Sequence, residues 1–359
     1  MNQDNGDNSV AGELVIGVTM GDPAGIGPEV IVKALADPGI RRLAKFIIFG
    51  MHEQLCYAAD RAEIEPFWGR HQHEKISRTY PYKVVVADYD EYSLAPWIRR
   101  PSVVAGESSM RFCLDAIDAA RAGIIDAVVT APINKSSWKL AGSKWPGHTE
   151  MLAERCRSKR KAMMFVAGRL KVALATIHEA LFEVRHKFTI GRVFEPIDLL
   201  NDALREYFDI ESPKIGVAAV NPHAGEDGQF GDEEQRIISP AILLAQEQGI
   251  DCYGPVPADT LFVRAARGEF DGVVAMYHDQ GMIPVKLLAF EEAVNVTIGI
   301  PIIRTSPAHG TAFDIAGRNV ADPSGMKAAM EMAVKMALTR KARQCAAAAE
   351  SRNSGRYAE

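Results

Sequence analysis

Three histidines in the 359-residue sequence each follow a short apolar run that is rich in β-branched residues. Such runs are typical of strands buried on both faces, as in a parallel sheet covered by helices. Ligands of open α/β sheets bind beyond the carboxyl ends of the strands. Three neutral imidazoles at that edge are a common ligand set for a catalytic metal ion. The sequence therefore predicts a metal site formed by His178, His223 and His278.

The neighbours of these histidines fit a metal-assisted reaction. Imidazole ligands favour zinc or cobalt, whereas magnesium prefers oxygen ligands. Asp279 directly follows His278, which makes this carboxylate a candidate for a further ligand or for an acid–base group. A lone histidine is more often a structural residue, so the metal hypothesis depends on the equivalent placement of all three.

Two cations lie within otherwise apolar segments, Lys286 in residues 283–288 and Arg304 in residues 300–305. A charged side chain in such a segment is rarely buried without a partner. Each cation therefore either pairs with an acid or faces an anionic ligand. Arg304 suits bidentate binding of a carboxylate or a phosphate, and Asn295, which precedes the same predicted strand, is a candidate neutral contact.

Two further segments stand at predicted helix starts. Residues 146–150 place His148 and Thr149 where they either grip an anion or simply cap the helix. The glycine-rich segment Gly21–Glu29 follows the first predicted strand, and its backbone suits close approach to an anionic ligand. Its spacing is neither G-x-G-x-x-G nor a P-loop, so a dinucleotide site does not follow from it alone.

The bulk properties are those of an ordinary globular protein. The net charge of −5 gives no reason to expect nucleic acid or an anionic membrane as a partner. No apolar run is long enough to span a bilayer, and residues 1–12 do not resemble a signal peptide. The five cysteines are scattered and lack CxxC spacing, which favours a reducing, cytoplasmic location.

Strand and helix patterns alternate from end to end, which predicts an α/β protein with a mostly parallel sheet. Strands are expected at 14–20, 46–49, 83–87 and 126–130, and helices at 27–35, 107–122, 149–156, 190–207, 233–248 and 326–348. At 359 residues the chain is long enough for two domains. A metal, an anion-binding patch and strand-end carboxylates favour a metal-dependent enzyme of small phosphorylated or carboxylated substrates. These residues leave hydrolase, dehydrogenase and lyase chemistry open.

The same segments resemble the 4-hydroxythreonine-4-phosphate dehydrogenase family, including a sister branch that oxidises D-threonate or D-erythronate 4-phosphate. The similarity runs from about residue 14 to residue 337. It rests on several motifs in order, namely Val15–Glu29, Pro146–Glu150, Asn221–Glu226, Pro257–Thr260, Met276–Gly281, Ile303–Ser306 and His309–Ala312.

The resemblance implies an isocitrate/isopropylmalate-dehydrogenase-like fold, with two α/β/α domains around a central cleft. We expect a cofactor-side domain at 14–135 plus 305–348, a metal-side domain at 136–304, and flexible tails at 1–13 and 349–359. The family resemblance also implies a homodimer with the active site at the subunit interface, to which the three metal-binding histidines contribute.

The implied reaction is metal-dependent and uses NAD or NADP. It oxidises the C3 hydroxyl of 4-phosphohydroxy-L-threonine, and decarboxylation then yields 3-amino-2-oxopropyl phosphate for pyridoxal phosphate synthesis. By this resemblance the divalent ion is zinc, cobalt or magnesium. The expected residues are Asp259, Asp279 and Lys286 for catalysis, His148, Thr149, Lys286, Asn295 and Arg304 for substrate, and Gly21, Asp22, Gly25, His309, Gly310 and Thr311 for the cofactor.

Some features leave the substrate open. Ala308 stands where the family often carries Asp, and Asn134 where some relatives carry His. Residues 253–259 and 281–288 are more similar to the aldonate-phosphate branch, which shares the chemistry but lacks the substrate amine. A three-histidine metallohydrolase and a catalytically silent binding protein are further alternatives. Intact histidines and cations disfavour the silent protein, and only a dehydrogenase needs a nicotinamide cofactor.

Overall fold

The structure is a computed structural model that describes residues 13–354. The parts of the predicted tails at residues 1–12 and 355–359 lie outside the described residues. Every strand belongs to one 12-stranded sheet with the order β3-β4-β2-β1-β5-β12-β11-β6-β7-β10-β8-β9. The strands are β1 Val15–Thr19, β2 Lys45–Gly50, β3 Gly69–Gln72, β4 Val84–Asp88, β5 Ala127–Thr130, β6 Ala162–Ala167, β7 Leu170–Leu174, β8 Ile215–Ala218, β9 Cys252–Val256, β10 Gly272–Ala275, β11 Val294–Ile298 and β12 Ile303–Pro307.

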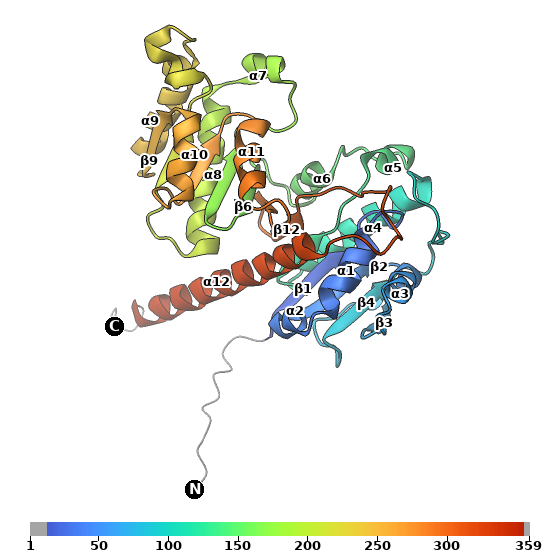
Figure 1. Ribbon diagram of the computed structural model, residues 1–359. Helices are drawn as coiled ribbons and strands as arrows, with labels where there is room; N and C mark the ends of the chain where they lie inside the picture. The colour runs from blue at the N-terminus through green and yellow to red at the C-terminus, as the bar shows by residue number, and fades with distance from the viewer. Residues whose placement is uncertain (1–12, 355–359) are drawn as a thin grey trace.

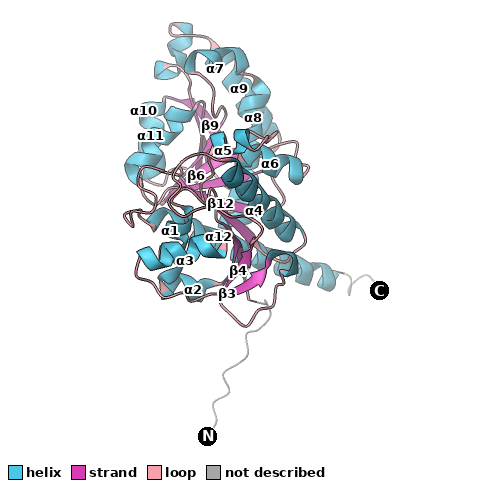
Figure 2. Ribbon diagram, turned by 90° about the vertical axis from the view of Figure 1, so that its right-hand side faces the viewer, coloured by secondary structure: helices cyan, strands magenta, loops and turns pink. Residues whose placement is uncertain are grey.

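Helices cover the sheet, so the expected α/β class is confirmed (Figures 1 and 2). The α-helices are α1 Gly27–Ala36, α2 Pro38–Leu43, α3 His52–Arg61, α4 Val103–Arg121, α5 Lys135–Leu140, α6 His148–Arg155, α7 Leu181–Lys187, α8 Ile190–Phe208, α9 Ser239–Glu247, α10 Ala258–Ala266, α11 His278–Leu288 and α12 Ser324–Ser354. Short turns of other helical types are η1 His73–Lys75, η2 Pro222–Gly228 and η3 Glu234–Ile238.

The sheet has two parallel halves joined by antiparallel strands. Strands β1 to β5 and β12 run in one direction, and β12 pairs with β5. Strands β7, β10, β8 and β9 form the other parallel half. Between the halves, β11 is antiparallel to both β12 and β6, and β6 is antiparallel to β7. Figure 1 shows the two halves as separate lobes. The boundaries of the two expected domains stay a prediction.

Apolar residues on both faces of the strands explain why helices lie on both sides of the sheet. All five residues of β1 and of β4 are buried, as the apolar sequences VIGVT and VVVAD predict. The long helix α12 packs along β12 and also contacts α8, so it belongs to the core of the first lobe and touches the second. It continues to Ser354 rather than ending at residue 348, because its alanine-rich end has high helix propensity.

One strand differs from the sequence prediction in a way that affects the site. Asn295 does not precede the strand of Arg304, but lies in β11, a strand of its own. The backbone of Gly299 has a φ of +85°, which favours glycine and lets the chain reverse between β11 and β12. Asn295 therefore pairs with Ser306 across the antiparallel ladder. Within residues 13–354, no helix has the length and apolar character needed to cross a membrane.

Candidate active site

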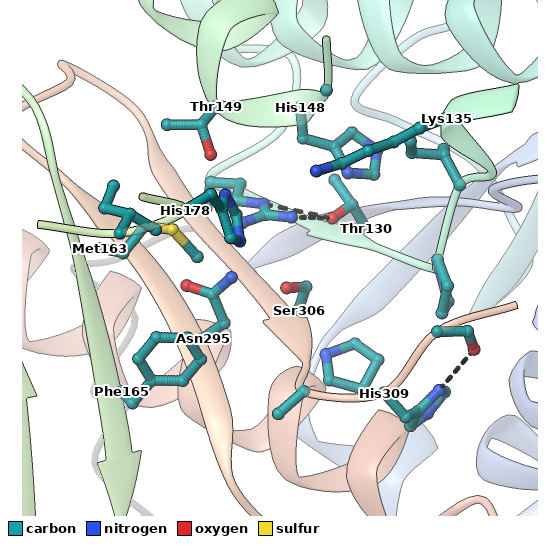
Figure 3. A pocket seen from close by; sticks show the side chains of 18 of the residues that line it. Thr130, Lys135, His148, Thr149, Met163, Phe165, His178, Asn295, Ser306 and His309 are labelled. Atoms are coloured by element: carbon teal, nitrogen blue, oxygen red, sulfur yellow. Dashed lines mark hydrogen bonds between the residues drawn. The ribbon is translucent and has the colours of Figure 1, made fainter. Parts of the chain in front are cut away.

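A cavity of about 590 Å³ lies where the two halves of the sheet meet. Side chains from β5, β6, β11 and β12 form its floor, and the starts of α5, α6 and α11 border it (Figure 3). The structure brings together in this cavity the predicted residues His148, Thr149, His178, His278, Lys286, Asn295, Arg304, His309 and Gly310. It leaves His223, Asp259, Asp279, Gly21, Asp22, Gly25 and Thr311 outside the cavity lining.

Arg304 is a buried cation in the wall of this cavity, only 3% exposed. Its Nε and Nη2 atoms donate to Thr130 Oγ1 at 3.1 and 2.6 Å, and Nη1 donates to Thr297 Oγ1 at 3.2 Å. No carboxylate of the described residues forms an ion pair with it. Burial lowers the pKa of Arg304 to about 10. Because a guanidinium has five N–H groups, donors remain for an anionic ligand. Of the two alternatives for Arg304, pairing with an acid is therefore not seen among the described residues, and binding of an anionic ligand stays a prediction.

His148 presents a neutral imidazole next to this cation. Burial, followed by the charge of Arg304, holds the pKa of His148 well below its usual value. Its ring packs edge-on against Trp138 at 5.6 Å, and its Nε2 atom is buried without a hydrogen-bond partner in the described part of the chain. The buried Oδ1 atom of Asn295 likewise has none there. Unsatisfied buried polar atoms are costly, so both atoms point to a ligand that completes them.

The capping alternative for residues 146–150 does not hold. The N-cap of α6 is Gly147, and no side chain caps this helix end. His148 and Thr149 are the first two residues of α6 and both line the cavity. They are thus available to a ligand at a helix start where backbone N–H groups also favour negative charge.

His178 and His278, two of the three predicted metal ligands, lie side by side at one end of the cavity. They follow the neighbouring parallel strands β7 and β10, and their ring centroids are 5.9 Å apart. Burial, and next the charge of Lys135, lowers the pKa of His178, which favours the neutral form that binds metals. Asp279 Oδ1 lies 2.7 Å from His278 Nδ1. That contact orients the ring and leaves Nε2 for a ligand, as is common at metal sites.

His223 is separated from the other two histidines within one chain. It lies in η2, five residues beyond the end of β8, where its backbone has a φ of +53°. Its side chain is 68% exposed, and its Nδ1 atom lies 3.0 Å from Glu226 Oε2. Among the described residues of a single chain, no group of three His, Cys, Asp or Glu side chains can hold a metal ion. One chain therefore assembles two of the three predicted ligands.

The three predicted catalytic residues occupy different places. Lys286 lines the cavity from α11, with Nζ 5.7 Å from the ring centre of Phe290. Asp279 reaches the cavity only through its contact with His278. Asp259 is in the first turn of α10, where its Oδ1 accepts a hydrogen bond from the Thr260 backbone at 2.9 Å. Within this chain Asp259 has no access to the cavity.

The glycine-rich turn is tightly packed. Gly21 has a φ of +71°, and a Cβ there would lie 2.3 Å from the Pro132 carbonyl oxygen. Asp22 is fully buried, and its carboxylate accepts hydrogen bonds from Ala24 N at 2.9 Å and Ser137 Oγ at 2.7 Å. Burial raises the pKa of Asp22. Gly21 and Asp22 therefore pack against the segment that leads into α5, and the contacts seen for them stabilise the fold.

Gly25 and Thr311, two further residues predicted to bind the cofactor, contact each other. A Cβ on Gly25 would lie 2.9 Å from the Thr311 carbonyl oxygen, and that oxygen accepts a hydrogen bond from Ile26 N at 3.0 Å. Of the predicted cofactor residues, His309 and Gly310 line the cavity. The turn and residues 309–311 are thus in contact through packing at Gly25 and Thr311, and their role in cofactor binding stays a prediction.

Sequence reasoning missed several cavity residues. Thr130 and Lys135 flank the β5–α5 connection, and Phe165 and Ser306 share the register of Asn295. The Thr130 and Lys135 segment follows an apolar strand, which is the signal that identified the histidines. Phe165 and Ser306 gave no such signal, because only strand pairing places them.

Fold and site together define a class, an α/β protein whose cavity combines cationic side chains with paired imidazoles. The chain belongs to the family described as pyridoxal phosphate biosynthetic protein PdxA, whose model matches residues 42–333. It is 44% identical over 328 residues to a 4-hydroxythreonine-4-phosphate dehydrogenase of Geobacter metallireducens, covering 89% of this chain and 94% of the relative.

Two further relatives add a second named substrate and a solved structure to the comparison. A D-threonate 4-phosphate dehydrogenase of Cupriavidus necator is 43% identical, covering 91% of this chain and 98% of the relative. The crystal structure of a 4-hydroxythreonine-4-phosphate dehydrogenase from Klebsiella pneumoniae superposes with a TM-score of 0.81 at 38% identity, covering 90% of this chain and 99% of that one. The family and fold expected from the motifs are therefore confirmed.

The lowered pKa of His148 predicts a pH-dependent stability. The unfolded chain protonates this group below about pH 6.5, whereas the folded chain does so only at lower pH. The folded state therefore binds fewer protons, and its stability falls as the pH drops below about 6.5, by at most about 1.4 kcal/mol per pH unit. His148→Gln should remove this loss, measured by urea unfolding at several pH values. The exposed His186→Gln serves as a control; equal pH slopes for wild type and His148→Gln would contradict the prediction.

Proposed function

We propose that this chain is an NAD(P)-dependent 4-hydroxythreonine-4-phosphate dehydrogenase. It would oxidise the C3 hydroxyl of 4-phosphohydroxy-L-threonine, and loss of carbon dioxide would give 3-amino-2-oxopropyl phosphate for pyridoxal phosphate synthesis. The observation that carries the proposal is the buried Arg304, which lacks an acidic partner among the described residues and faces the cavity. Family membership supplies the reaction that needs such an anion site.

The cavity residues suit the two ends of this substrate. Arg304 offers a planar pair of donors to a carboxylate or a phosphate. Lys286 adds a mobile point charge from the α11 side. The neutral His148, with Thr149 and Asn295, completes the contacts to hydroxyl, amine and anionic oxygens. Fixing the substrate at both ends orients C3 toward the hydride acceptor.

The imidazole end of the cavity fits a divalent metal ion. His178 and His278 would hold it, because both rings flank the same space, burial favours neutral His178, and Asp279 leaves Nε2 of His278 free. This donor set favours zinc or cobalt over magnesium. When bound, such an ion would supply Lewis acidity, which acidifies an alcohol and stabilises negative charge on oxygen. Asp279 would hold the His278 ring and its proton in place.

Because one chain lacks a third metal ligand in its cavity, we propose a homodimer with the active site at the subunit interface. His223 is exposed and outside the cavity of its own chain, so we propose that each subunit contributes His223 to the other. Beside His278, α11 and its end expose a row of large apolar side chains, Ile283, Leu287 and Phe290, that are 59–81% accessible. Apolar surface of this kind marks an interface. The exposed Asp259 would enter the site in the same way and move a proton there.

The nicotinamide cofactor would lie along the other side of the cavity, near His309 and Gly310. The backbone of Gly310 is open, since a Cβ there would meet no atom within 4 Å. Gly21, Asp22, Gly25 and Thr311 would shape this wall and would contact the cofactor through their backbone. When bound, NAD or NADP supplies the hydride acceptor. The described cysteines are all free, which supports the proposed cytoplasmic location.

The second candidate is the same chemistry on D-threonate or D-erythronate 4-phosphate. The Cupriavidus necator relative favours it, because its name assigns such a substrate at 43% identity. The cations and imidazoles serve both substrates, which differ by an amine or a hydroxyl at C2.

A direct assay separates these candidates. Purified enzyme with zinc or cobalt should form NAD(P)H from 4-phosphohydroxy-L-threonine with a higher kcat/KM than from either aldonate phosphate. A chelator should abolish this turnover and added metal should restore it. Preference for an aldonate phosphate would select the second candidate. Absence of nicotinamide reduction with all three substrates would show that the proposed function is wrong.

Subunit mixing tests the shared metal site. His223→Ala and His278→Ala should each be inactive alone. If the histidines come from different subunits, each mixed dimer has one intact site, so random exchange should restore about a quarter of wild-type activity. Mixing His178→Ala with His278→Ala is the matched control, because these two lie in one cavity and no mixed dimer has an intact site. No recovery with the first pair would contradict the shared site.

A further inference from the structure

Lys135 is a cation of the cavity to which neither the family motifs nor the expected contacts assign a role. We propose that Lys135 binds an anionic oxygen of the substrate, its carboxylate or its phosphate, on the side next to His178. The proposal rests on the proposed function, because it requires a substrate with two anionic groups. It adds a third anion-binding side chain to Arg304 and Lys286.

The direction of the Lys135 side chain places its charge in the cavity. Lys135 is the first residue of α5 and lines the cavity. Figure 3 shows its side chain reaching across the cavity in front of His148 toward His178. Lys135 therefore brings a positive charge into the cavity that His178, His278 and Arg304 also line.

The backbone under Lys135 is held firmly, so the side chain starts from a fixed point. Asn134 caps α5 by accepting a hydrogen bond from Ser137 N at 2.9 Å. Ser137 is buried and donates through Oγ to the buried carboxylate of Asp22 at 2.7 Å. Trp138, also fully buried, donates to Ser109 Oγ at 2.9 Å. Such fixed placement lowers the entropic cost of binding an anion.

No carboxylate pairs directly with the ammonium group of Lys135 in the described part of the chain. Within residues 13–354, Lys135 forms no ion pair, although Glu150 also borders the cavity. Both side chains lie next to Gly147, since the position of a Cβ there would be 3.6 Å from Lys135 Cε and 3.7 Å from Glu150 Oε2. A substrate with a carboxylate and a phosphate carries anionic groups at opposite ends, and the fork of Arg304 holds only one of them. Lys135 is placed to bind an anionic oxygen that Arg304 does not reach.

The test compares Lys135→Met, which keeps the apolar stem, with Lys135→Arg, which keeps the charge. Lys139→Met is the matched control, because Lys139 is exposed on the same helix and does not line the cavity. Lys135→Met should raise KM about 10- to 100-fold, as expected for the loss of a charged hydrogen bond, with a smaller change in kcat. Lys135→Arg should recover most of this loss.

Two probes identify the bound group, and their binding is measured by calorimetry. Dihydroxyacetone phosphate carries a phosphate without a carboxylate, and L-threonine carries a carboxylate without a phosphate. Selective weakening of the first probe by Lys135→Met would support the phosphate, and selective weakening of the second would support the carboxylate. Unchanged KM and unchanged binding of both probes, or equal losses in Lys139→Met, would overturn the proposal. A wild-type enzyme that binds the probes but turns over no substrate would refute the proposed function alone.

Discussion

The buried guanidinium of Arg304 sets the constraint on which this structure depends. A charge removed from water is costly unless it is paired, and here only the neutral hydroxyls of Thr130 and Thr297 satisfy part of it. These two threonines belong to β5 and β11, on either side of β12, so the cation also ties the junction of the two sheet halves. Under the proposed function, a substrate anion would complete this uncompensated charge at the centre of the fold.

The strand directions explain why the other functional groups gather around that charge. Parallel strands β7 and β10 end at one edge, where His178 and His278 follow them. The antiparallel strands β6 and β11 connect this edge to β12, and their register sets Asn295 opposite Ser306. The imidazole end and the anion-binding end thus share one cavity although they come from different halves of the sheet.

Local patterns predicted much of this arrangement. Buried apolar runs located the strands, and residue types at their ends located His178 and His278. Arg304 was located as a cation within an apolar segment, and the motifs identified the family. Contacts between segments that are distant in the sequence could not be predicted from local patterns. The separation of β11 from β12 depends on strand pairing, and the displaced His223 depends on a left-handed turn at η2. The close packing of the glycine-rich turn and the role proposed for Lys135 depend on the contact between this turn and the start of α5, where Ser137 bonds to Asp22.

The most direct test of the central claim is the free energy of unfolding of Arg304→Met, measured with and without 4-phosphohydroxy-L-threonine and without nicotinamide cofactor. Without substrate, the variant should be at least as stable as the wild type, because it no longer buries an unpaired charge. Substrate at about 100 times Kd should stabilise the wild type by about 2.7 kcal/mol and the variant hardly at all. A variant that is much less stable alone, yet equally stabilised by substrate, would show that Arg304 holds the fold rather than the substrate.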